Sequence, residues 1–320
     1  MKKKIIGGVN VFVKKLKDEI GKVMIGMDHE IELLSIALLQ GGHVLFESVP
    51  GTGKTMLAKS FAACIQSSFS RIQFTPDVLP SDVTGIHYFN PKENEFELRP
   101  GPVVTNVLLA DEINRATPRT QSSLLEVMEE KQVTIEGETL KLEEPFIVLA
   151  TQNPVESQQG TFPLPAAQLD RFLLKVPIAY PEFESEREML RRFKYKQPLN
   201  DLHPVITPEE LNKCAREVKE IHVSEDIESY ILQIVRKTRE HELIELGVSP
   251  RASLALMRAA QGMAYVKGRE YVTPGDIKKT AKYVLSHRIS LTPEASLTKT
   301  NEGIMEELIE EIVVPVESRV

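Results

Sequence analysis

Cysteine is scarce in this sequence. The only two cysteines in 320 residues, Cys64 and Cys214, lie far apart in apolar segments with helical spacing. Core thiols are therefore expected, rather than a disulfide or a metal site. This cysteine usage fits a reducing compartment, and we predict a cytoplasmic protein.

Long apolar runs are also lacking. The longest uncharged apolar stretch, residues 33–46, is shorter than the ~20 residues that a membrane-spanning helix needs. The N-terminus begins with Lys2–Lys4, as a signal peptide would, but Lys14, Lys15 and Lys17 interrupt the apolar segment that a signal requires. We expect neither export nor a membrane span.

An excess of basic residues is missing too. The formal net charge is -7, and Lys2–Lys4 is the one run of basic residues, so a nucleic-acid-binding face is poorly supported. The composition, with 42% hydrophobic and 27% charged residues, is that of a folded globular protein. At roughly 100–200 residues per domain, the length predicts two domains.

Apolar residues recur at helical spacing over residues 9–23 and 28–40, and then as five short runs separated by helical segments. These strand-like runs are residues 44–47, 71–74, 104–110, 146–151 and 172–176. Their alternation with helices predicts an α/β fold, in which a five-stranded parallel sheet is covered on both faces as an αβα sandwich.

The last part of the chain shows a helical pattern only. Three helix-start signals place a hydroxyl side chain before a proline, at Thr207-Pro208, Ser249-Pro250 and Thr273-Pro274. We therefore predict an αβα domain over residues 1–181 and an all-α domain over residues 182–320.

The first predicted strand runs into a glycine-rich turn, residues 48–55 (SVPGTGKT), and a helical pattern follows. This is the context of a P-loop, in which backbone N–H groups and a helix N-terminus converge on a phosphate. Lys54 would contact the β and γ oxygens, and Thr55 would bind Mg²⁺. Gly51 and Gly53 would let the backbone approach the phosphates. Ser48 replaces the usual first glycine, before the residues that wrap the phosphates.

The third predicted strand runs into two carboxylates, Asp111 and Glu112. We expect Asp111 to order the water ligands of Mg²⁺ and Glu112 to polarise the attacking water. An acidic pair after a strand is often a solvated loop start, so this prediction depends on the P-loop. The fourth strand ends before Asn153, at the same sheet edge, where its amide would hold the water, although a plain turn is the alternative.

Several longer strings resemble the MoxR family of AAA+ ATPases. They are residues 75–85 (TPDVLPSDVTG), 99–102 (RPGP), 109–116 (LADEINRA), 150–154 (ATQNP), 168–172 (QLDRF), 249–252 (SPRA) and 271–274 (YVTP). The resemblance covers nearly the whole chain. It implies an AAA+ P-loop core with a helical lid, ATP/ADP and Mg²⁺ as cofactors, and hydrolysis of ATP to ADP and phosphate.

The resemblance also implies roles for single residues. It gives Asn153 the sensor-1 role and Arg251 the sensor-2 role. Arg251 would lie in the first turn of a lid helix, where its guanidinium and the helix N-terminus both favour phosphate, with an exposed helix-start arginine as the alternative. Ile25 and Gly26 resemble the segment that lines the adenine pocket, though such a pair is equally a linker between two helices.

Arg171 resembles the arginine finger that reaches into the site of a neighbouring subunit. Its alternative is a local surface pair with Asp170. Arg115 and Arg119 are further candidate fingers. The predicted catalytic residues are Glu112, Asn153, Arg171 and Arg251. The predicted nucleotide-binding residues are Ile25, Gly26, Pro50, Gly51, Thr52, Gly53, Lys54, Thr55, Met56, Asp111 and Arg251, with Thr55 and Asp111 as the metal-binding pair.

Two hairpins are predicted within the core, over residues 86–98 and 133–140. They correspond to the helix-2 insert and the pre-sensor-1 hairpin of the family, which would face the pore of a ring. By the resemblance, the chain forms a homo-oligomeric ring, a hexamer, that remodels or matures client proteins, with proteins carrying a von Willebrand factor A domain as partners.

Two other functions remain open from the sequence. One is a helicase-like nucleic-acid motor, against which the hairpins count because they carry more acidic than basic residues. The other is a nucleotide-dependent switch or scaffold without turnover, which would require Glu112 or Arg171 to be misplaced.

Overall fold

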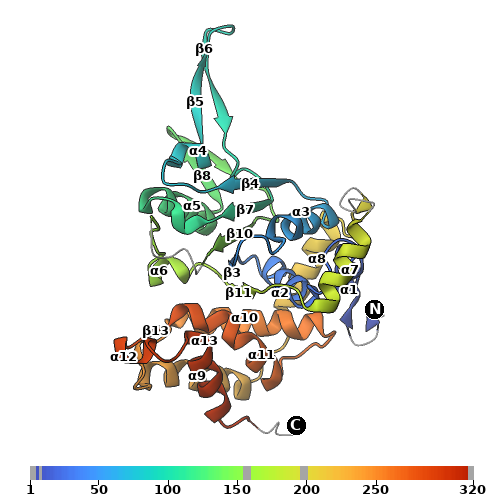
Figure 1. Cartoon of the computed structure of the whole chain (residues 1–320), viewed down its shortest axis with the longest axis vertical. Coiled ribbons are helices and arrows are strands. Elements are labelled where there is room, and N and C mark those ends of the chain that lie inside the picture. The colour runs from blue at the N-terminus through green and yellow to red at the C-terminus, as the bar shows by residue number, and fades with distance from the viewer. Residues whose placement is uncertain (1–4, 7–8, 154–159, 195–200, 316–320) are drawn as a thin grey trace.

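A five-stranded parallel sheet lies at the centre of the molecule (Figure 1). The computed structural model describes residues 5–6, 9–153, 160–194 and 201–315, so Lys2–Lys4 and Pro154 lie outside the described residues. The strands are β3 (Val44–Ser48), β4 (Phe69–Gln73), β7 (Val107–Asp111), β10 (Ile147–Gln152) and β11 (Leu174–Ile178), in the order β11-β3-β10-β7-β4. The predicted sheet is confirmed, and because all neighbours pair in parallel, the carboxyl ends of its strands meet at one edge.

Alternate strand residues pack on opposite faces of the sheet. Phe46 and Leu149 belong to the core on one face, whereas Leu45 and Val148 belong to the core on the other, and all four are fully buried. Burial on both faces explains why the strands read as continuous apolar runs. The helices of the sandwich are α1 (Val11–Ile20), α2 (Asp28–Leu39) and α3 (Lys54–Cys64) on the first face and α5 (Pro118–Glu130) on the second.

The predicted helix at residues 9–23 begins two residues later than expected. A short strand β1 (Ile5–Ile6) pairs with β2 (Val9–Asn10), and the side chain of Asn10 then caps α1 by accepting the N–H of Phe12. The predicted strand at residues 104–110 likewise starts only at Val107, because residues 101–106 form turns before it.

Helices dominate the chain after β11. They are α7 (Phe183–Phe193), α8 (Pro208–Lys219), α9 (Glu225–Glu240), α10 (Pro250–Val266), α11 (Pro274–Leu285), η3 (Ser286–Arg288), α12 (Pro293–Ser296) and α13 (Asn301–Glu311). In Figure 1, α9 to α13 form a layer below the sheet, whereas α7 and α8 lie at the side of the core near α1.

The expectation of helices only is wrong at one point in this region. Strand β12 (Ile244–Leu246) pairs antiparallel with β13 (Ser290–Leu291). Both strands are too short, and too far apart in the sequence, to produce a local alternating pattern.

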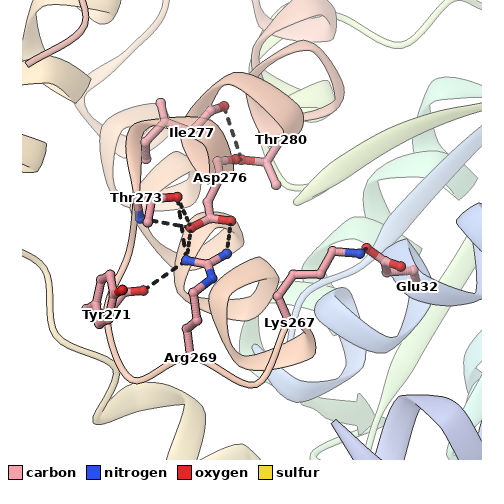
Figure 2. Close-up of polar contacts among 8 residues, drawn as sticks. All are labelled: Glu32, Lys267, Arg269, Tyr271, Thr273, Asp276, Ile277 and Thr280. Carbon is pink, nitrogen blue, oxygen red and sulfur yellow. Dashed lines mark hydrogen bonds and ion pairs between the residues drawn. The ribbon is translucent and has the colours of Figure 1, made fainter. Parts of the chain in front are cut away.

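Helices α8, α10 and α11 begin at the predicted signals, but the contacts that fix their starts differ. Thr207 and Thr273 form capping boxes with Glu210 and Asp276. Figure 2 shows that Asp276 also pairs with Arg269, at 2.5 Å between Oδ1 and the guanidinium. Ser249 differs, because its hydroxyl donates to the carboxylate of Asp170 at 3.1 Å instead of capping α10.

Glu32 of α2 joins the segment after α10 to helix α1. Its carboxylate lies 2.9 Å from the ammonium of Lys267, just after α10, and 2.7 Å from that of Lys17 on α1. The pair with Lys267 is drawn in Figure 2. The Glu32 side chain is 7% exposed. Burial alone would raise the pKa of Glu32, but the two lysines outweigh it and hold this pKa below its usual value, so the carboxylate is ionised and bound from both sides.

Both predicted hairpins are confirmed. Strands β5 (Gly85–Asn90) and β6 (Glu95–Pro100) form a long antiparallel pair that projects from the top of the molecule in Figure 1. Strands β8 (Gln132–Ile135) and β9 (Glu138–Lys141) form the second pair. The two hairpins touch, since the Nε2 atom of His87 lies 3.5 Å from the carboxylate of Glu138. Among the described residues, no helix is long and apolar enough to cross a membrane.

Candidate nucleotide site

The glycine-rich turn joins β3 to α3 at the carboxyl edge of the sheet. Gly51 and Gly53 have φ angles of +84° and +85°, which glycine adopts without steric cost. No described side chain caps α3, and its first turn carries no acidic residue, so the backbone N–H groups there are available to an anion. The ammonium of Lys54 lies 3.4 Å from the carbonyl oxygen of Val49, so it already points toward the turn.

The two carboxylates after β7 are tied together by a residue that was not predicted for the site, Thr151 on β10. The Thr151 hydroxyl donates to Oδ1 of Asp111 at 2.7 Å and accepts the backbone N–H of Glu112 at 2.8 Å. Glu112 has a φ of +57°, a conformation that non-glycine residues seldom adopt and that recurs at functional sites. Thr151 lies within the family-like string at residues 150–154, which is the only signal that pointed to it.

Both carboxylates also pair with arginines. Oδ2 of Asp111 lies 2.6 Å from the guanidinium of Arg71 on β4, and Oε2 of Glu112 lies 3.0 Å from Nε of Arg115. Arg71 had no sequence signal, because it reaches Asp111 only through strand pairing. A hydrated Mg²⁺ ion at Asp111 would compete with Arg71 for the same oxygen.

Asn153 lies at this edge as well. It follows β10 directly and is 6% exposed. Because Gln152 is the register partner of Glu47 on β3, Asn153 is level with the start of the glycine-rich turn. The structure therefore brings together the turn, Asp111, Glu112 and Asn153.

Ile25 and Gly26 lie between the glycine-rich turn and α7. A Cβ atom on Gly53 would lie 3.1 Å from the terminal methyl of Met24, and one on Gly26, whose φ is +78°, would lie 2.7 Å from the hydroxyl of Ser185. This places the predicted adenine-binding segment beside the turn. Of the other predicted nucleotide-binding residues, Thr52 is buried, Thr55 and Met56 are half-buried, and Pro50 is exposed.

Arg171 and Arg251 lie together, but not at this edge. The guanidinium of Arg251 is 2.7 Å from Oε1 of Glu129 at the end of α5, and that of Arg171 is 3.1 Å from Oε2 of the same residue. Arg171 also donates to the carbonyl oxygen of Leu125. The hydrogen bond from Arg251 lowers the pKa of Glu129, so one ionised carboxylate holds both guanidinium groups.

The strand register shows that Arg171 lies at the amino ends of the strands, whereas the glycine-rich turn lies at their carboxyl ends. Arg251 lies beside Arg171. Arg171 precedes β11, whose first residue, Leu174, is the partner of Val44 at the start of β3. The turn follows Ser48 at the other end of β3. At about 3.3 Å per residue, the length of β3 separates the two edges by about 15 Å. The structure thus does not bring Arg171 or Arg251 to the turn of their own chain.

The alternative prediction for Arg171, a local surface pair with Asp170, is wrong. Asp170 instead pairs with Arg288 of η3, at 2.7 Å between Oδ1 and Nε. The side chain of Arg288 is 3% exposed and also donates to the carbonyl oxygen of Phe172. Together with the hydrogen bond from Ser249, these contacts fix the start of α10 to the segment that carries Arg171. Arg119 is exposed near the start of α5.

Family models and individual relatives match most of the chain. The family model described as the ATPase family associated with various cellular activities (AAA) matches residues 43–174, and that of the AAA lid domain matches residues 236–308. The chain is 50% identical to the uncharacterized protein YeaC of Bacillus subtilis, over 95% of each chain. It is 39% identical to the chaperone MoxR1 of Mycobacterium tuberculosis, over 93% of this chain and 81% of the relative.

A solved structure is similar as well. It is a crystal structure from Cytophaga hutchinsonii whose description proposes an ATPase. Its TM-score is 0.88 at 40% sequence identity, and the match covers 95% of each chain. The arrangement of sheet and C-terminal helices is therefore shared with a relative of similar length.

Proposed function

Since the chain belongs to the MoxR family of AAA+ ATPases, we propose that it binds ATP with Mg²⁺ and hydrolyses the β–γ phosphate bond at the carboxyl edge of its sheet. The observation that carries this proposal is the Asp111–Thr151–Glu112 arrangement beside the glycine-rich turn. It holds the carboxylate of Asp111 near the glycine-rich turn and fixes the backbone of Glu112. A fixed Glu112 is what alignment of an attacking water requires.

The proposed roles follow from the chemistry of each group. The N–H groups of the turn and of the first turn of α3, with Lys54, would bind the phosphates. Glu112 would accept a proton from the attacking water, and Asn153 would orient that water. Ile25 and Gly26 would border the adenine.

The residues present fit a magnesium ion. The Thr55 hydroxyl and the Asp111 carboxylate are the hard oxygen donors that Mg²⁺ prefers, and Mg²⁺ is usually bound by one or two such groups together with substrate phosphates. When bound, the ion would neutralise charge on the β and γ oxygens. Asp111, whose oxygens accept hydrogen bonds from Thr151 and Arg71, would hold it through water.

The position of Arg171 and Arg251 supports assembly into a ring. Neither lies at the glycine-rich turn of its own chain, so we propose that both act on the nucleotide of a neighbouring copy. The amino edge of one sheet would then contact the carboxyl edge of the sheet in the next copy. Such a head-to-tail contact closes into a ring when the rotation between neighbouring copies is a simple fraction of a full turn. We propose a hexamer with a core at residues 1–181 and a lid at residues 182–320.

We further propose that the ring remodels or matures client proteins, as the name of the chaperone MoxR1 indicates for that relative. Partners with a von Willebrand factor A domain and a cytoplasmic location are part of the same proposal. The acidic residues of the β5–β6 hairpin, Glu93, Glu95 and Glu97, favour a protein client over a nucleic acid.

Two variants test the ATPase proposal. Lys54→Ala should abolish binding of a fluorescent ATP analogue, and retained affinity would contradict the phosphate-binding role. Glu112→Gln should bind the analogue normally while phosphate release falls to background. Unchanged hydrolysis in that variant would show that Glu112 is not the base.

A further inference from the structure

Lys175 of β11 links the sheet to the C-terminal helices. Its ammonium lies 2.8 Å from Oε2 of Glu47 on β3 and 3.1 Å from Oε1 of Glu302 on α13. Strand β11 is at the edge of the sheet, and α11 packs against it. In Figure 1, it is the strand of the sheet nearest to the layer of C-terminal helices. Lys175 thus lies where this layer meets the sheet.

The Lys175 side chain is only 14% exposed, and it is bound from both sides. Burial alone would lower the pKa of Lys175, but Glu47 and Glu302 outweigh it and hold this pKa above its usual value. The Glu302 side chain is 41% exposed, whereas that of Glu47 is 26% exposed. A movement of α13 that withdrew Glu302 would leave the ammonium with Glu47 alone.

Glu47 also joins the two strands that lead into the proposed nucleotide site. Its Oε1 accepts a hydrogen bond from Nε2 of Gln152 at 3.3 Å, and the two residues are register partners on β3 and β10. The glycine-rich turn begins directly after Glu47, and Asn153 directly follows Gln152. We call Glu302, Lys175, Glu47 and Gln152 the polar row. It connects α13 to the residues that precede the turn and Asn153.

The sheet end of the polar row lies on the face opposite to the Thr151 hydroxyl. Glu47 is two residues after Leu45, and Gln152 is two residues after Ala150, both of which belong to the core on the second face. Because strand residues alternate between faces, Thr151 points to the other side. The polar row would therefore act on the site through the backbones of β3 and β10, without touching the nucleotide.

We propose that Lys175 is a positioning residue for the glycine-rich turn and Asn153, and that its contact with Glu302 makes their position depend on α13. This inference rests on the proposed function, because the turn and Asn153 act in hydrolysis only if ATP binds at this edge. Coupling between distant places is carried by hydrogen-bonded networks and rigid elements, and the polar row with β3 and β10 is such a connection. A purely structural role predicts no change in kcat.

Glu302→Gln tests the link from α13, since Glu302 is remote from the nucleotide site. We expect kcat to fall about threefold to tenfold, while the urea midpoint of unfolding changes little because the pair is partly exposed. The matched control is Glu306→Gln on the same helix. Glu306 pairs with Lys282 of α11, also at 3.1 Å, and its variant should keep wild-type kcat. Wild-type kcat in Glu302→Gln, or equal losses in both variants, would overturn the inference.

Variants of Lys175 test the order of the contacts. Lys175→Met removes both ion pairs and should lower kcat at least as much as Glu302→Gln, whereas Lys175→Arg keeps the charge and should restore most of it. Since Glu302 acts through Lys175, adding Glu302→Gln to Lys175→Met should lower kcat no further. Losses that multiply in the double variant would mean that the two residues act separately, against the proposal.

Hydrogen exchange separates this inference from the proposed function. Without nucleotide, the backbone amides of residues 46–48 and 150–152 should exchange at least about threefold faster in Glu302→Gln than in the wild type, and unchanged in Glu306→Gln. A wild-type chain that does not hydrolyse ATP would remove the proposed function, while this comparison still tests the link to α13. A chain that hydrolyses ATP but shows wild-type exchange and kcat in Glu302→Gln would remove only the positioning role.

Discussion

The guanidinium of Arg251 lies on the same carboxylate as that of Arg171. Glu129 accepts both, at 2.7 and 3.1 Å, although Arg251 is 122 positions away from it in the chain. In the proposed ring, a phosphate of a neighbouring copy would therefore compete with Glu129 for these two arginines. In a single copy this carboxylate offsets one of their two positive charges, which reduces the repulsion between them.

We expect the two arginines to act as a pair in trans. Arg171→Ala and Arg251→Ala should each lower kcat strongly, for Arg171 on the order of a thousandfold, while ATP binding to the isolated subunit is retained. Mixing either variant with Lys54→Ala subunits should recover activity. At some interfaces the Lys54→Ala subunit then supplies both arginines, and the arginine variant supplies an intact glycine-rich turn. Phosphate release across a range of mixing ratios measures this recovery.

Arg236→Ala on α9 is the matched control for loss of one exposed arginine, and it should keep wild-type kcat. If no mixing ratio restored any activity, the arginines would have a structural role within their own chain.

Thr151 should position both carboxylates of the site. Thr151→Val removes the hydroxyl that bonds Asp111 and the N–H of Glu112, and leaves buried groups without a partner at a cost of about 1–3 kcal/mol. We expect kcat to fall about tenfold or more with little change in ATP affinity. Thr151→Ser keeps the hydroxyl and should restore most of kcat. Steady-state kinetics that showed equal loss in both variants would indicate a packing effect instead.

Arg288 should stabilise the attachment of the lid. Arg288→Met leaves the partly buried carboxylate of Asp170 without its arginine, and we expect a loss of about 3–5 kcal/mol in the free energy of unfolding. Arg288→Met/Asp170→Asn should recover part of this loss, since the unpaired charge is gone. Urea unfolding measures both variants. Additive effects of the two substitutions would contradict a direct pairing.

His43 should make the protein less stable in acid. Its ring is buried, its Nε2–H donates to the carbonyl oxygen of Met128, and its Nδ1 accepts the N–H of Val148. Burial lowers the pKa of His43 to about 4 from its usual 6.5. The unfolded chain therefore binds a proton as the pH falls below 6.5, which the folded chain does not bind until about pH 4.

Stability should accordingly fall between pH 6.5 and pH 4, with His43 contributing up to about 3 kcal/mol of that loss. His287, whose pKa burial also lowers, adds a loss of the same sign. In His43→Gln, urea unfolding at several pH values should show a smaller decrease toward acid. His222→Gln, which changes an exposed ring, is the control and should keep the wild-type dependence.

The elements that sequence patterns predicted well are those whose signal is local. The five strands, the two hairpins and the glycine-rich turn each follow from contiguous residues, and strand ends were displaced mainly where turns precede an apolar run, as before Val107. The grouping of the turn with Asp111, Glu112 and Asn153 was also predictable, because carboxyl ends of parallel strands share an edge.

The remaining contacts depend on chain segments that meet only after folding. Arg71 reaches Asp111 across a strand pair, and Glu129 meets Arg251 across the junction of core and lid. No spacing in the sequence marks either pair. The same holds for β12 and β13, whose few residues pair although a long stretch of helices separates them in the sequence.

The helix α10 joins two distant places in one chain. It runs from Pro250, next to Arg251 at the amino edge of the sheet, to Val266, and Lys267 then holds Glu32 beside α1. Its 17 residues form a rod about 25 Å long. We therefore expect a tilt imposed at Arg251 to displace Lys267 and its contact with Glu32 on α2, the helix that follows the segment beside the glycine-rich turn. If Arg251 contacts the nucleotide of a neighbouring copy, as proposed, that nucleotide would in this way be mechanically coupled to the glycine-rich turn of this chain.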